Sequence, residues 1–530
     1  MGDPNPYSME FDDIRSNEVV TIVNQFEKKP PGFDHIPAII LMWIIDIIAP
    51  TLANIFNTCV DLGIYPKCLK IAKVTPLLKG GDPCVADNYR PISVLPQINK
   101  LFEKIIHERM TTFETQHNIL KKSQFGFRKG HSTSHGITHA SEQVTKHLEK
   151  RKVCALLFID LKSAFDTVDM NILMQKLEHY GFRGEISKLL TSYLEGRKQF
   201  VKSGDIESYL LSVLCGVPQG SVLGPLLFIL YINDIANCSN FENILFADDA
   251  ALLLAADNIK GLKKQINNEV KLLHEWLITS KLTLNLSKTK YMLFANKNVL
   301  SKKMRKKFRI TIGKYTIHEV EQIKYLGVIL DQNLNWGNHV EYLITKLSRA
   351  AGIMYKIRKY LPMKARLLVY NTLVSSYLQY SIPAWGRCPS TTLTKLQSLQ
   401  NRIIRCMTFS PPQTNVDLKY KSLKILKVYE LNFYETAKFM HRFYHNLMPI
   451  AFQDYFQAIS HSYNTRARNV NCYVTPQPRT EKGKRSIRFC GIKLWSIVPD
   501  SLRNLTPKLF KQHLKDYILN NCIDFGQLGF

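Results

Sequence analysis

The sequence has little cysteine and a marked shortage of acidic residues. Its 11 cysteines never lie closer than nine positions apart, so no CxxC pair is available to nucleate a zinc site. Their scatter is typical of reduced, mostly buried thiols, which indicates an intracellular protein of the nucleus or the cytoplasm. Against 43 Asp and Glu stand 71 Lys and Arg, a formal charge of +28. Such an excess suits a polyanion such as nucleic acid, with an anionic membrane as the weaker alternative.

The chain also lacks a signal segment and an uninterrupted apolar run of bilayer length. Its start, MGDPNPYSMEF, is acidic and polar, so secretion is not expected. The most apolar stretch, residues 36–56, contains Asp46 and Pro50, which are expected to interrupt it before a bilayer-spanning length is reached. We therefore expect a helix buried in the protein and no membrane partner.

No fixed-period repeat is present, and 530 residues exceed one ordinary core. After Trp336, apolar residues recur at helical spacing from Val340 to Met354. Proline-bearing turns, such as FSPPQTN at 409–415, suggest where regions divide. The predicted parts are an N-terminal helical extension, a mixed region, a helical region and a basic C-terminal region, over residues 1–60, 61–331, 332–407 and 408–530.

Carboxylates interrupt or end apolar runs of strand length at two places. VCALLFID, residues 153–160, ends in Asp160, and ILFADDAALLL, residues 244–254, holds Asp248 and Asp249 between two short strands. The second pattern predicts a hairpin with the two acids at its turn. If these strands are neighbours in one sheet, three carboxylates meet at one edge, where hard oxygen donors suit Mg²⁺. The alternative is a solvated turn, the commoner fate of a lone Asp-Asp pair.

Motifs around these acids occur in the order and near the spacing of a known family. They are FIDLKSAFDTVD at 158–169, GVPQGSVLGPLLFILYIND at 216–234, FADD at 246–249, LNLSKTKYMLF at 284–294 and YLGVILD at 325–331. With NYRPISVLPQINKLFEKIIHERM and SQFGFRKGHST upstream, they resemble the reverse transcriptases of jockey-like non-LTR (LINE-type) retrotransposons. The resemblance implies a right-hand polymerase of the α+β class. Residues 61–331 would form the fingers and a palm with an antiparallel sheet, 332–407 a helical thumb, and 408–530 a helical, basic C-terminal domain.

The resemblance implies a role for each matching residue of the palm. Asp160, Asp248 and Asp249 fall on the family's three metal-binding aspartates. Phe165 falls on the aromatic gate beneath the sugar, and its alternative is an ordinary core position. We expect it at the start of the helix that follows the Asp160 strand. Lys288 matches a candidate proton donor to pyrophosphate, with Lys290 as the alternative.

Further matches concern the nucleotide and the primer. Gln219 and Gly220 fall on a turn that helps to hold nucleotide and template, where a small residue permits close backbone approach. Lys79 and Arg90 match basic finger positions that contact the triphosphate, a task for which a bidentate arginine is well suited. Gly327 matches the hairpin that grips the primer end.

The activity that the resemblance implies is that of an RNA-directed DNA polymerase, a nucleotidyltransferase. It copies element RNA into DNA, adding dNTPs to the 3′-end of a DNA primer or target DNA. Two Mg²⁺ ions about 4 Å apart, with Mn²⁺ as an alternative, would activate the 3′-hydroxyl and stabilise the leaving pyrophosphate. An RNA-dependent RNA polymerase needs a polar group for the 2′-hydroxyl, where Phe165 offers an apolar wall. The other alternative is a non-catalytic nucleic-acid-binding remnant of a mobile element.

Two expected absences complete the interpretation. Elements of this kind usually also encode an endonuclease, and the residues before the fingers are too few to hold one. We expect either a 5′-truncated copy or an endonuclease supplied by another chain. His131, His135 and His139 stand at i, i+4 and i+8, which could mimic a metal site on a helix. A fingers helix near the template, with neutral histidines that pack or stack, is favoured over that metal site.

Overall fold

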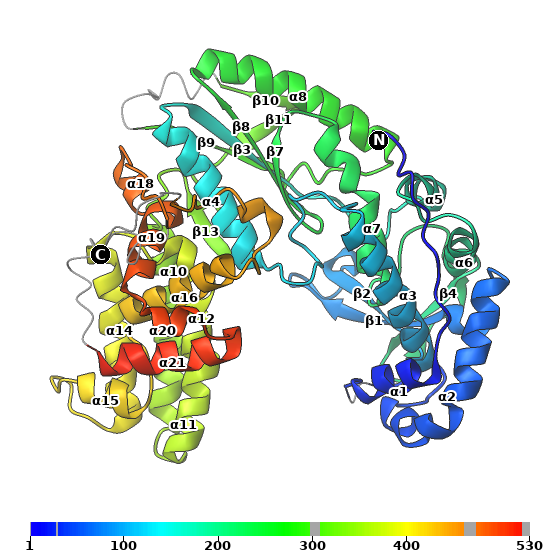
Figure 1. Ribbon diagram of the computed structural model, residues 1–530, viewed down its shortest axis with the longest axis horizontal. Helices are drawn as coiled ribbons and strands as arrows, with labels where there is room; N and C mark the ends of the chain where they lie inside the picture. The colour runs from blue at the N-terminus through cyan, green and yellow to red at the C-terminus, as the bar shows by residue number, and fades with distance from the viewer. Residues whose placement is uncertain (1, 28–29, 297–307, 460–472, 522–530) are drawn as a thin grey trace. The chain divides into compact units, whose positions relative to one another are not determined.

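The computed structural model describes residues 2–27, 30–296, 308–459 and 473–521 (Figure 1). The chain forms two compact units. Unit 1 comprises residues 1–127, 160–240 and 269–285, and unit 2 comprises residues 128–159, 241–268 and 286–530. The predicted domain boundaries at 60, 331 and 407 stay predictions.

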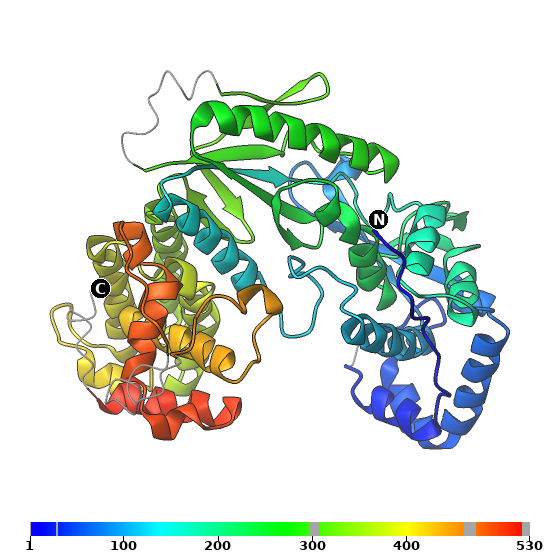
Figure 2. The same cartoon turned by 45° about the horizontal axis from the view of Figure 1, so that its top comes forward.

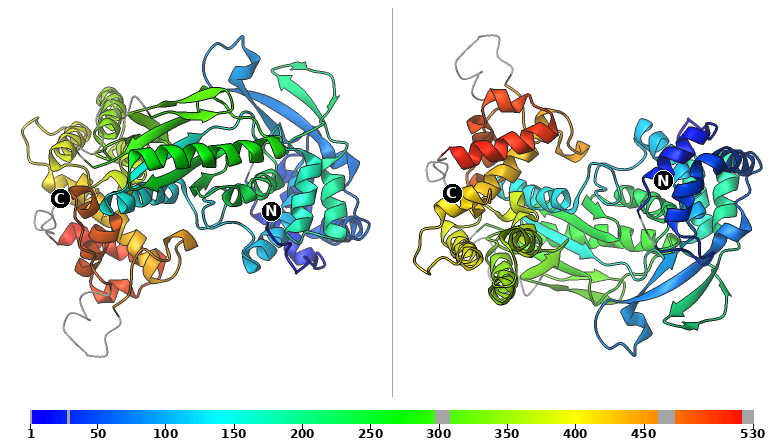
Figure 3. Two further views of the ribbon diagram at one scale, coloured as in Figure 1. Left: turned by 90° about the horizontal axis from the view of Figure 1, so that it is seen from above. Right: turned by 90° about the horizontal axis from the view of Figure 1, so that it is seen from below.

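Unit 1 contains a small sheet of strand order β2-β1-β4-β5, with β6 also paired to β4. β1 and β2 are antiparallel, with Leu78 opposite Tyr89, and β1 runs parallel to β4. In Figure 3 these two ribbons, blue and teal, lie side by side. The strands are β1 (Ile71–Leu78), β2 (Tyr89–Val94), β4 (Lys198–Ser203), β5 (Ile206–Glu207) and β6 (Leu211–Ser212).

Helices bury the core of unit 1. Phe102 stacks on Phe56 with ring centroids 4.4 Å apart, and Tyr65 also stacks on the ring of Phe102. The buried carboxylate of Glu103 accepts a hydrogen bond of 2.6 Å from the Val222 N–H, which caps the start of a fully apolar helix. The helices are α1 (Ser16–Asn24), α2 (Ala38–Asp61), α3 (Gln97–Gln116), α5 (Met170–His179), α6 (Glu185–Leu194) and α7 (Leu223–Tyr231).

Helix α2 differs from the prediction in length and in burial. Asp46 and Pro50 do not interrupt this helix. Of the described helices, it is the one that is long and apolar enough to cross a membrane, by length and composition only. One side, from Leu41 to Val60, is buried in unit 1, because those residues recur at helical spacing. The other side is exposed, with Trp43 at 73% and Ile47 at 79%. The sequence therefore predicted the buried side correctly and missed the exposed apolar side.

The six-stranded sheet of unit 2 has the order β10-β11-β9-β3-β8-β7. All seven residues of β3 are buried, because the strand is central and covered on both faces. Its neighbours β8 and β9 are both antiparallel to it, and only β9 and β11 are parallel. The strands are β3 (Val153–Ile159), β7 (Glu242–Phe246), β8 (Asp249–Ala256), β9 (Lys290–Phe294), β10 (Ile310–Ile312) and β11 (Tyr315–Glu319), and a separate hairpin joins β12 (Gln322–Tyr325) to β13 (Val328–Asp331).

Two helices cover the faces of this sheet. α4 (Thr133–Glu149) packs on β3 and β7, and the first half of α8 (Ile259–Thr279) lies on the other face (Figure 2). The Asn267 side chain fixes α8 to the sheet edge, since it donates to the carbonyl of Arg309 and accepts from the N–H of Thr311. These two helices and the strands between them form a three-layer core.

From Val340 onward, the described residues of unit 2 are mostly helical, as predicted. The buried residues of α10 include Val340, Leu343 and Leu347, which is the periodicity seen in the sequence. The helices are α10 (Gly337–Ile357), α11 (Met363–Tyr370), α12 (Ser376–Gln379), α13 (Ile382–Trp385), α14 (Ser390–Thr408), α15 (Asp417–Ser422), α16 (Val428–Tyr444), α18 (Glu481–Lys484), α19 (Ile487–Ile497), α20 (Asp500–Arg503) and α21 (Pro507–Asn520).

The described cysteines are free thiols, in agreement with the sequence, but they are not mostly buried. Only Cys154, Cys388 and Cys490 are buried, whereas Cys68 and Cys215 are among the exposed ones. Burial raises the pKa of Cys154 and Cys388, each to about 12, so these two thiols stay protonated at neutral pH.

The histidines of α4 pack against aromatic rings of the C-terminal region. His139 lies 5.6 Å from the ring of Phe452, and its Nδ1 is 3.0 Å from the Tyr455 hydroxyl. Burial lowers the pKa of His139 to about 4 and that of His135 to about 3, so both are neutral at pH 7. Across the described residues, no three His, Cys, Asp or Glu side chains are gathered as a metal site. Neutral packing, the favoured interpretation, is what the structure has.

This packing predicts a loss of stability in mild acid. The folded pKa of His139 is below its unfolded value of about 6.5, so its stabilising effect is complete above that pH and is lost as the pH falls toward 4. At pH 5 the loss is roughly 2 kcal/mol of unfolding free energy. We measure how far the unfolding free energy falls between pH 7.5 and pH 5.0. In His139→Gln this fall is expected to be smaller than in the unmodified protein by about that amount. His318→Gln, which removes an exposed histidine, serves as the control, and equal losses in all three proteins would contradict the assignment.

Candidate functional site

Asp248 and Asp249 lie at one edge of the unit 2 sheet, and Asp160 directly follows the central strand of that sheet in the chain. β3 ends at Ile159, which is paired with Ala250 of β8, and Asp160 is the next residue of the chain. β7 and β8 form the predicted hairpin, in which Phe246 is opposite Asp249. Its tight turn is Ala247 and Asp248, with Ala247 in the left-handed region at φ 56°. The register thus places the end of β3 beside the strand that begins at Asp249.

This arrangement explains how an apolar run accommodates two adjacent carboxylates. The apolar residues of β7 and β8 are buried on both sides of the turn, whereas Asp248 is half-buried and Asp249 is exposed. The turn therefore leaves the two acids hydrated at the sheet edge, so they avoid the cost of burial. The described structure does not gather three carboxylates as metal ligands, so joint metal binding stays a prediction.

Phe165 lies in a turn, and not at the start of a helix as its place after the strand suggested. Residues 162–167 form turns, and α5 begins at Met170, five residues after Phe165. The half-buried ring of Phe165 stacks on the buried ring of Phe228, with centroids 4.5 Å apart, and meets Phe127 edge-on. The carbonyl of Phe165 accepts a hydrogen bond of 2.8 Å from the Val217 N–H. The turn is thus fastened to the segment that leads into Gln219.

Two further acids, Asp166 and Asp169, lie close to Phe165 in the chain. Asp169 caps α5, since its side chain accepts a hydrogen bond from the Ile172 N–H. The hydrogen bond from the Lys281 ammonium lowers the pKa of Asp169. Loss of hydration raises the pKa of Asp166, and the nearby Lys79 ammonium opposes that rise. Asp169 is therefore structural.

Gln219 and Gly220 lie against strand β2. The Ser93 N–H donates to the Gln219 carbonyl at 2.8 Å, and a Cβ on Gly220 would stand 2.5 Å from the Ser93 carbonyl oxygen. Gly220 also has a φ of 120°, which L side chains rarely adopt. The predicted need for a small residue is thus met, but the close backbone is that of Ser93.

The two basic finger residues come from one hairpin. Arg90 lies in β2 opposite Leu77, and Lys79 follows the end of β1, where its N–H donates to the Asn88 carbonyl. Both side chains are exposed. The interaction of Lys79 with Asp166 places this lysine near the turn that carries Phe165.

A cavity of about 390 Å³ lies beside these residues in unit 1. Its lining includes Asp166, Gln219 and Arg197. Arg197 is 2% exposed and covers the Tyr193 ring, and its buried Nη2 has no hydrogen-bond partner among the described residues. Sequence reasoning missed Arg197, because an arginine in GRKQFVK resembles one more surface cation. Only its burial in the folded protein distinguishes Arg197 from a surface cation.

The last two predicted residues belong to unit 2. Lys288 is exposed in a turn two residues before β9, and Lys290, its alternative, is the first residue of that strand. Gly327 and Leu326 form the tight turn between β12 and β13, both with positive φ, as a two-residue hairpin requires. The Tyr380 hydroxyl donates to the Leu326 carbonyl at 2.7 Å, and so holds this turn in place. Tyr380 was also missed, because it lies far away in the sequence.

Comparison with known proteins matches this region to one family. Residues 77–330 match the family model described as reverse transcriptase (RNA-dependent DNA polymerase). The probable RNA-directed DNA polymerase from transposon BS of Drosophila melanogaster is 28% identical, over 83% of this chain and 49% of that protein. The RNA-directed DNA polymerase from mobile element jockey of Drosophila funebris is 28% identical, over 77% and 45%. Its Drosophila melanogaster counterpart is 26% identical, over 91% and 52%.

The chain spans about half the length of the curated relatives it matches. Among solved structures, telomerase from Candida albicans, in complex with a fragment of telomeric RNA, aligns over 69% of this chain and 64% of its own, with 12% identity and a TM-score of 0.33.

Residues 77–330, a little under half of the chain, thus match a reverse transcriptase domain, a class with the mixed helix and sheet of a right-hand polymerase. The relatives are RNA-directed DNA polymerases of mobile elements, among them jockey, so the chain is similar to the polymerases of jockey-like non-LTR, or LINE-type, retrotransposons. The resemblance drawn from the motifs is thereby confirmed.

Proposed function

We propose that this chain acts as the RNA-directed DNA polymerase of a non-LTR retrotransposon. It would copy an RNA template by adding deoxynucleotides to a primer 3′-end. One observation carries the proposal: β3, which leads into Asp160, is paired with β8, which begins at Asp249 beside Asp248. Acids at the ends of neighbouring strands are what nucleotidyl transfer requires, since they can share divalent cations at one edge.

The donor set suits Mg²⁺, with Mn²⁺ as an alternative. Carboxylate oxygens on a hydrated turn leave room for the waters and phosphate oxygens that Mg²⁺ retains. Asp160, Asp248 and Asp249 would hold the ions, which, when bound, activate the primer 3′-hydroxyl and stabilise the leaving pyrophosphate.

The remaining steps fall to side chains of this chain. The exposed cations Arg90 and Lys79 would neutralise and orient the triphosphate. Phe165, braced by Phe228, would exclude a 2′-hydroxyl, and Lys288 would donate a proton to pyrophosphate. The β12–β13 turn at Gly327 would position the primer end.

The partners follow from this activity. They would be an RNA template, dNTPs and a DNA primer or target DNA with an exposed 3′-end. An endonuclease on another chain or segment would supply that end by nicking. The reaction would take place inside the cell, in the nucleus or the cytoplasm.

A primer-extension assay tests the proposal. On poly(rA)/oligo(dT), the purified chain is expected to incorporate dTTP in the presence of Mg²⁺ or Mn²⁺ and to stop when EDTA removes the metal. Binding of the same primer–template is measured in parallel by fluorescence anisotropy. Tight binding with no incorporation in either metal would instead support a non-catalytic nucleic-acid-binding remnant, and preference for UTP over dTTP would support an RNA polymerase.

A further inference from the structure

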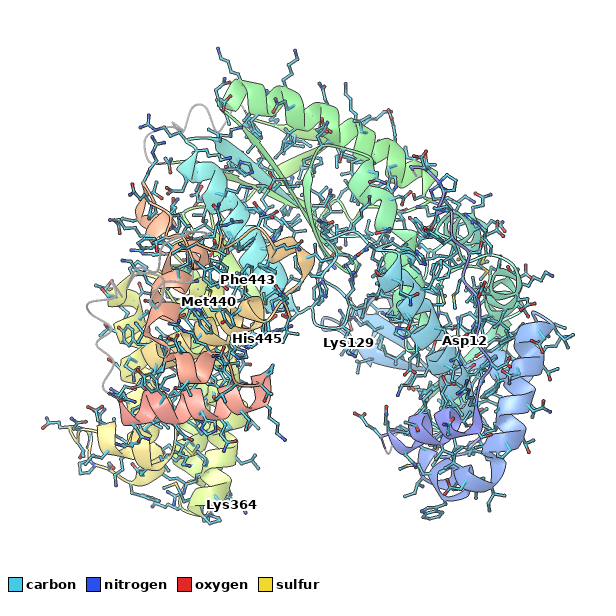
Figure 4. The ribbon with its side chains drawn as sticks, in the orientation of Figure 1. Asp12, Lys129, Lys364, Met440, Phe443 and His445 are labelled. Carbon is cyan, nitrogen blue, oxygen red and sulfur yellow. The ribbon has the colours of Figure 1, made fainter. Side chains whose placement is uncertain are left out.

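A cavity of about 550 Å³ lies within unit 2, outside the residues assigned to polymerisation. Its walls come from the segment that begins α4, from α13, from α16 and from α21. Figure 4 labels Met440 and Phe443 on α16 and His445 just after it, and α16 contributes more of the lining residues than any other helix. The volume is in the range of small-ligand sites.

One wall of the cavity is apolar and rigid. Phe439 packs edge-on against Phe452, with centroids 5.3 Å apart. Phe510 stacks on the buried ring of His441 at 3.9 Å. Phe439 is 7% and Phe510 is 1% exposed, so these rings fix the shape of the apolar wall and offer little open face to a ligand.

Cations lie on another part of the wall. Arg442 is held by hydrogen bonds from its Nη2 to the carbonyls of Gly130 and Leu447, at 2.9 and 3.1 Å. Both bonds use Nη2, and within the described residues Nε and Nη1 of Arg442 make no hydrogen bond. Lys511 is exposed on α21.

The acidic residue of the cavity does not cancel this charge. Glu435 is paired with Lys438, whose ammonium lies 2.7 Å from both of its carboxylate oxygens. That pair is close to neutral, so Arg442 and Lys511 remain to attract an anion.

A histidine with an unsatisfied polar atom also lines the cavity. His135 is 7% exposed, and its buried Nδ1 has no hydrogen-bond partner in the described part of the chain. The ring is neutral at pH 7, so His135 adds no charge to the wall.

We infer that this cavity binds one unpaired nucleotide of single-stranded RNA, with its phosphate at Arg442 and Lys511 and its base against the apolar part of the wall beside Phe439. Proteins recognise single-stranded RNA by stacking splayed bases on aromatic side chains and by holding the backbone with cations. The choice of RNA rests on the proposed function. The cavity itself would place a second grip on the template, distinct from the polymerisation site.

Equilibrium binding tests the inference without any polymerisation. The probe is a fluorescein-labelled, unstructured 12-nucleotide RNA, and the comparison is the same sequence as an RNA duplex. The protein is the full chain. We expect Lys511→Glu to raise the Kd for the single strand by about tenfold, because it reverses a charge in the cavity. Lys508→Glu, an exposed residue one turn earlier on α21, makes the same charge change outside the cavity and is expected to raise it by only about twofold.

A second variant approaches the cavity from the opposite wall. Ser134→Glu introduces a carboxylate at the start of α4 and is expected to raise the single-strand Kd by about tenfold as well. Equal effects of Lys508→Glu and Lys511→Glu, or equal losses for single strand and duplex, would overturn the inference. Because no dNTP is present, failure of DNA synthesis leaves these results unaffected, and failure here leaves the polymerase assignment standing.

Discussion

Asp248→Asn is expected to abolish DNA synthesis on poly(rA)/oligo(dT), with a loss of at least about a thousandfold in kcat. The asparagine keeps the shape of the hairpin turn but removes the negative charge that would hold a divalent cation beside the primer end. Primer–template affinity is expected to change little, since the chain, with a formal charge of +28 before the substitution, keeps its excess of cations for contacts with phosphates. Primer extension and anisotropy on the same preparations check both expectations.

A matched control lies at the other end of the same strand. Asp257 directly follows β8, and its side chain is 87% exposed. Asp257→Asn therefore removes one acidic charge from the same strand region without touching the turn, and extension is expected to stay at the unmodified rate. If Asp248→Asn extends primers as fast as Asp257→Asn, the metal assignment is wrong.

Phe165→Val is expected to raise incorporation of UTP relative to dTTP by at least about tenfold, or roughly 1.4 kcal/mol of lost discrimination. The ring stacks on buried Phe228, so it is held in one position. A ring fixed beside the sugar leaves no room for a 2′-hydroxyl and offers it no hydrogen bond, and valine would remove that barrier. The ratio of kcat/KM for dTTP and UTP is the measurement.

The competing role for Phe165 is that of a packing residue. In that case Phe165→Val lowers the melting temperature and total activity but leaves the sugar ratio unchanged. Phe165→Tyr is the control, because it keeps the ring that would exclude the 2′-hydroxyl, and its ratio is expected to match that of the unmodified protein. A changed ratio in both variants would also reject the gate.

The elements that local pattern determines were predictable. β3 is a continuous apolar run, and β7 and β8 flank an Asp-containing turn, so their strands followed from short-range sequence. The buried face of α10 followed from its helical periodicity. Asp169 preceded a helical pattern, and it is the N-cap of α5.

What escaped prediction depends on residues far apart in the chain. Arg197 differs from a surface cation only because unit 1 closes over it, and Tyr380 reaches a turn 54 residues before it. The place of Phe165 in a turn is set by hydrogen bonds to the 216–217 segment. Such pairings leave no periodic trace in a single sequence.

The C-terminal region shows the same limit most clearly. Its composition predicted a basic tail, but the buried carboxylate of Glu142 on α4 accepts a hydrogen bond from the Ile487 N–H at 2.6 Å. Glu149, on the same helix, accepts from the N–H groups of Arg479 and Thr480. Charge and composition indicated that the region is basic, but nothing local indicated that it closes over α4.

These hydrogen bonds between α4 and the C-terminal region have a consequence for folding during synthesis. A ribosome releases α4 more than 300 residues before its partner at Ile487, so the helix emerges with its acids and histidines uncovered. Closing so long a loop is slow, so the imidazole and carboxylate groups of α4 stay accessible to chaperones until the segment around Ile487 has been made. A messenger cut short before the codon for Ile487 would yield a chain that can form its β-hairpin of aspartates but cannot shield α4, and cellular proteolysis is expected to remove it.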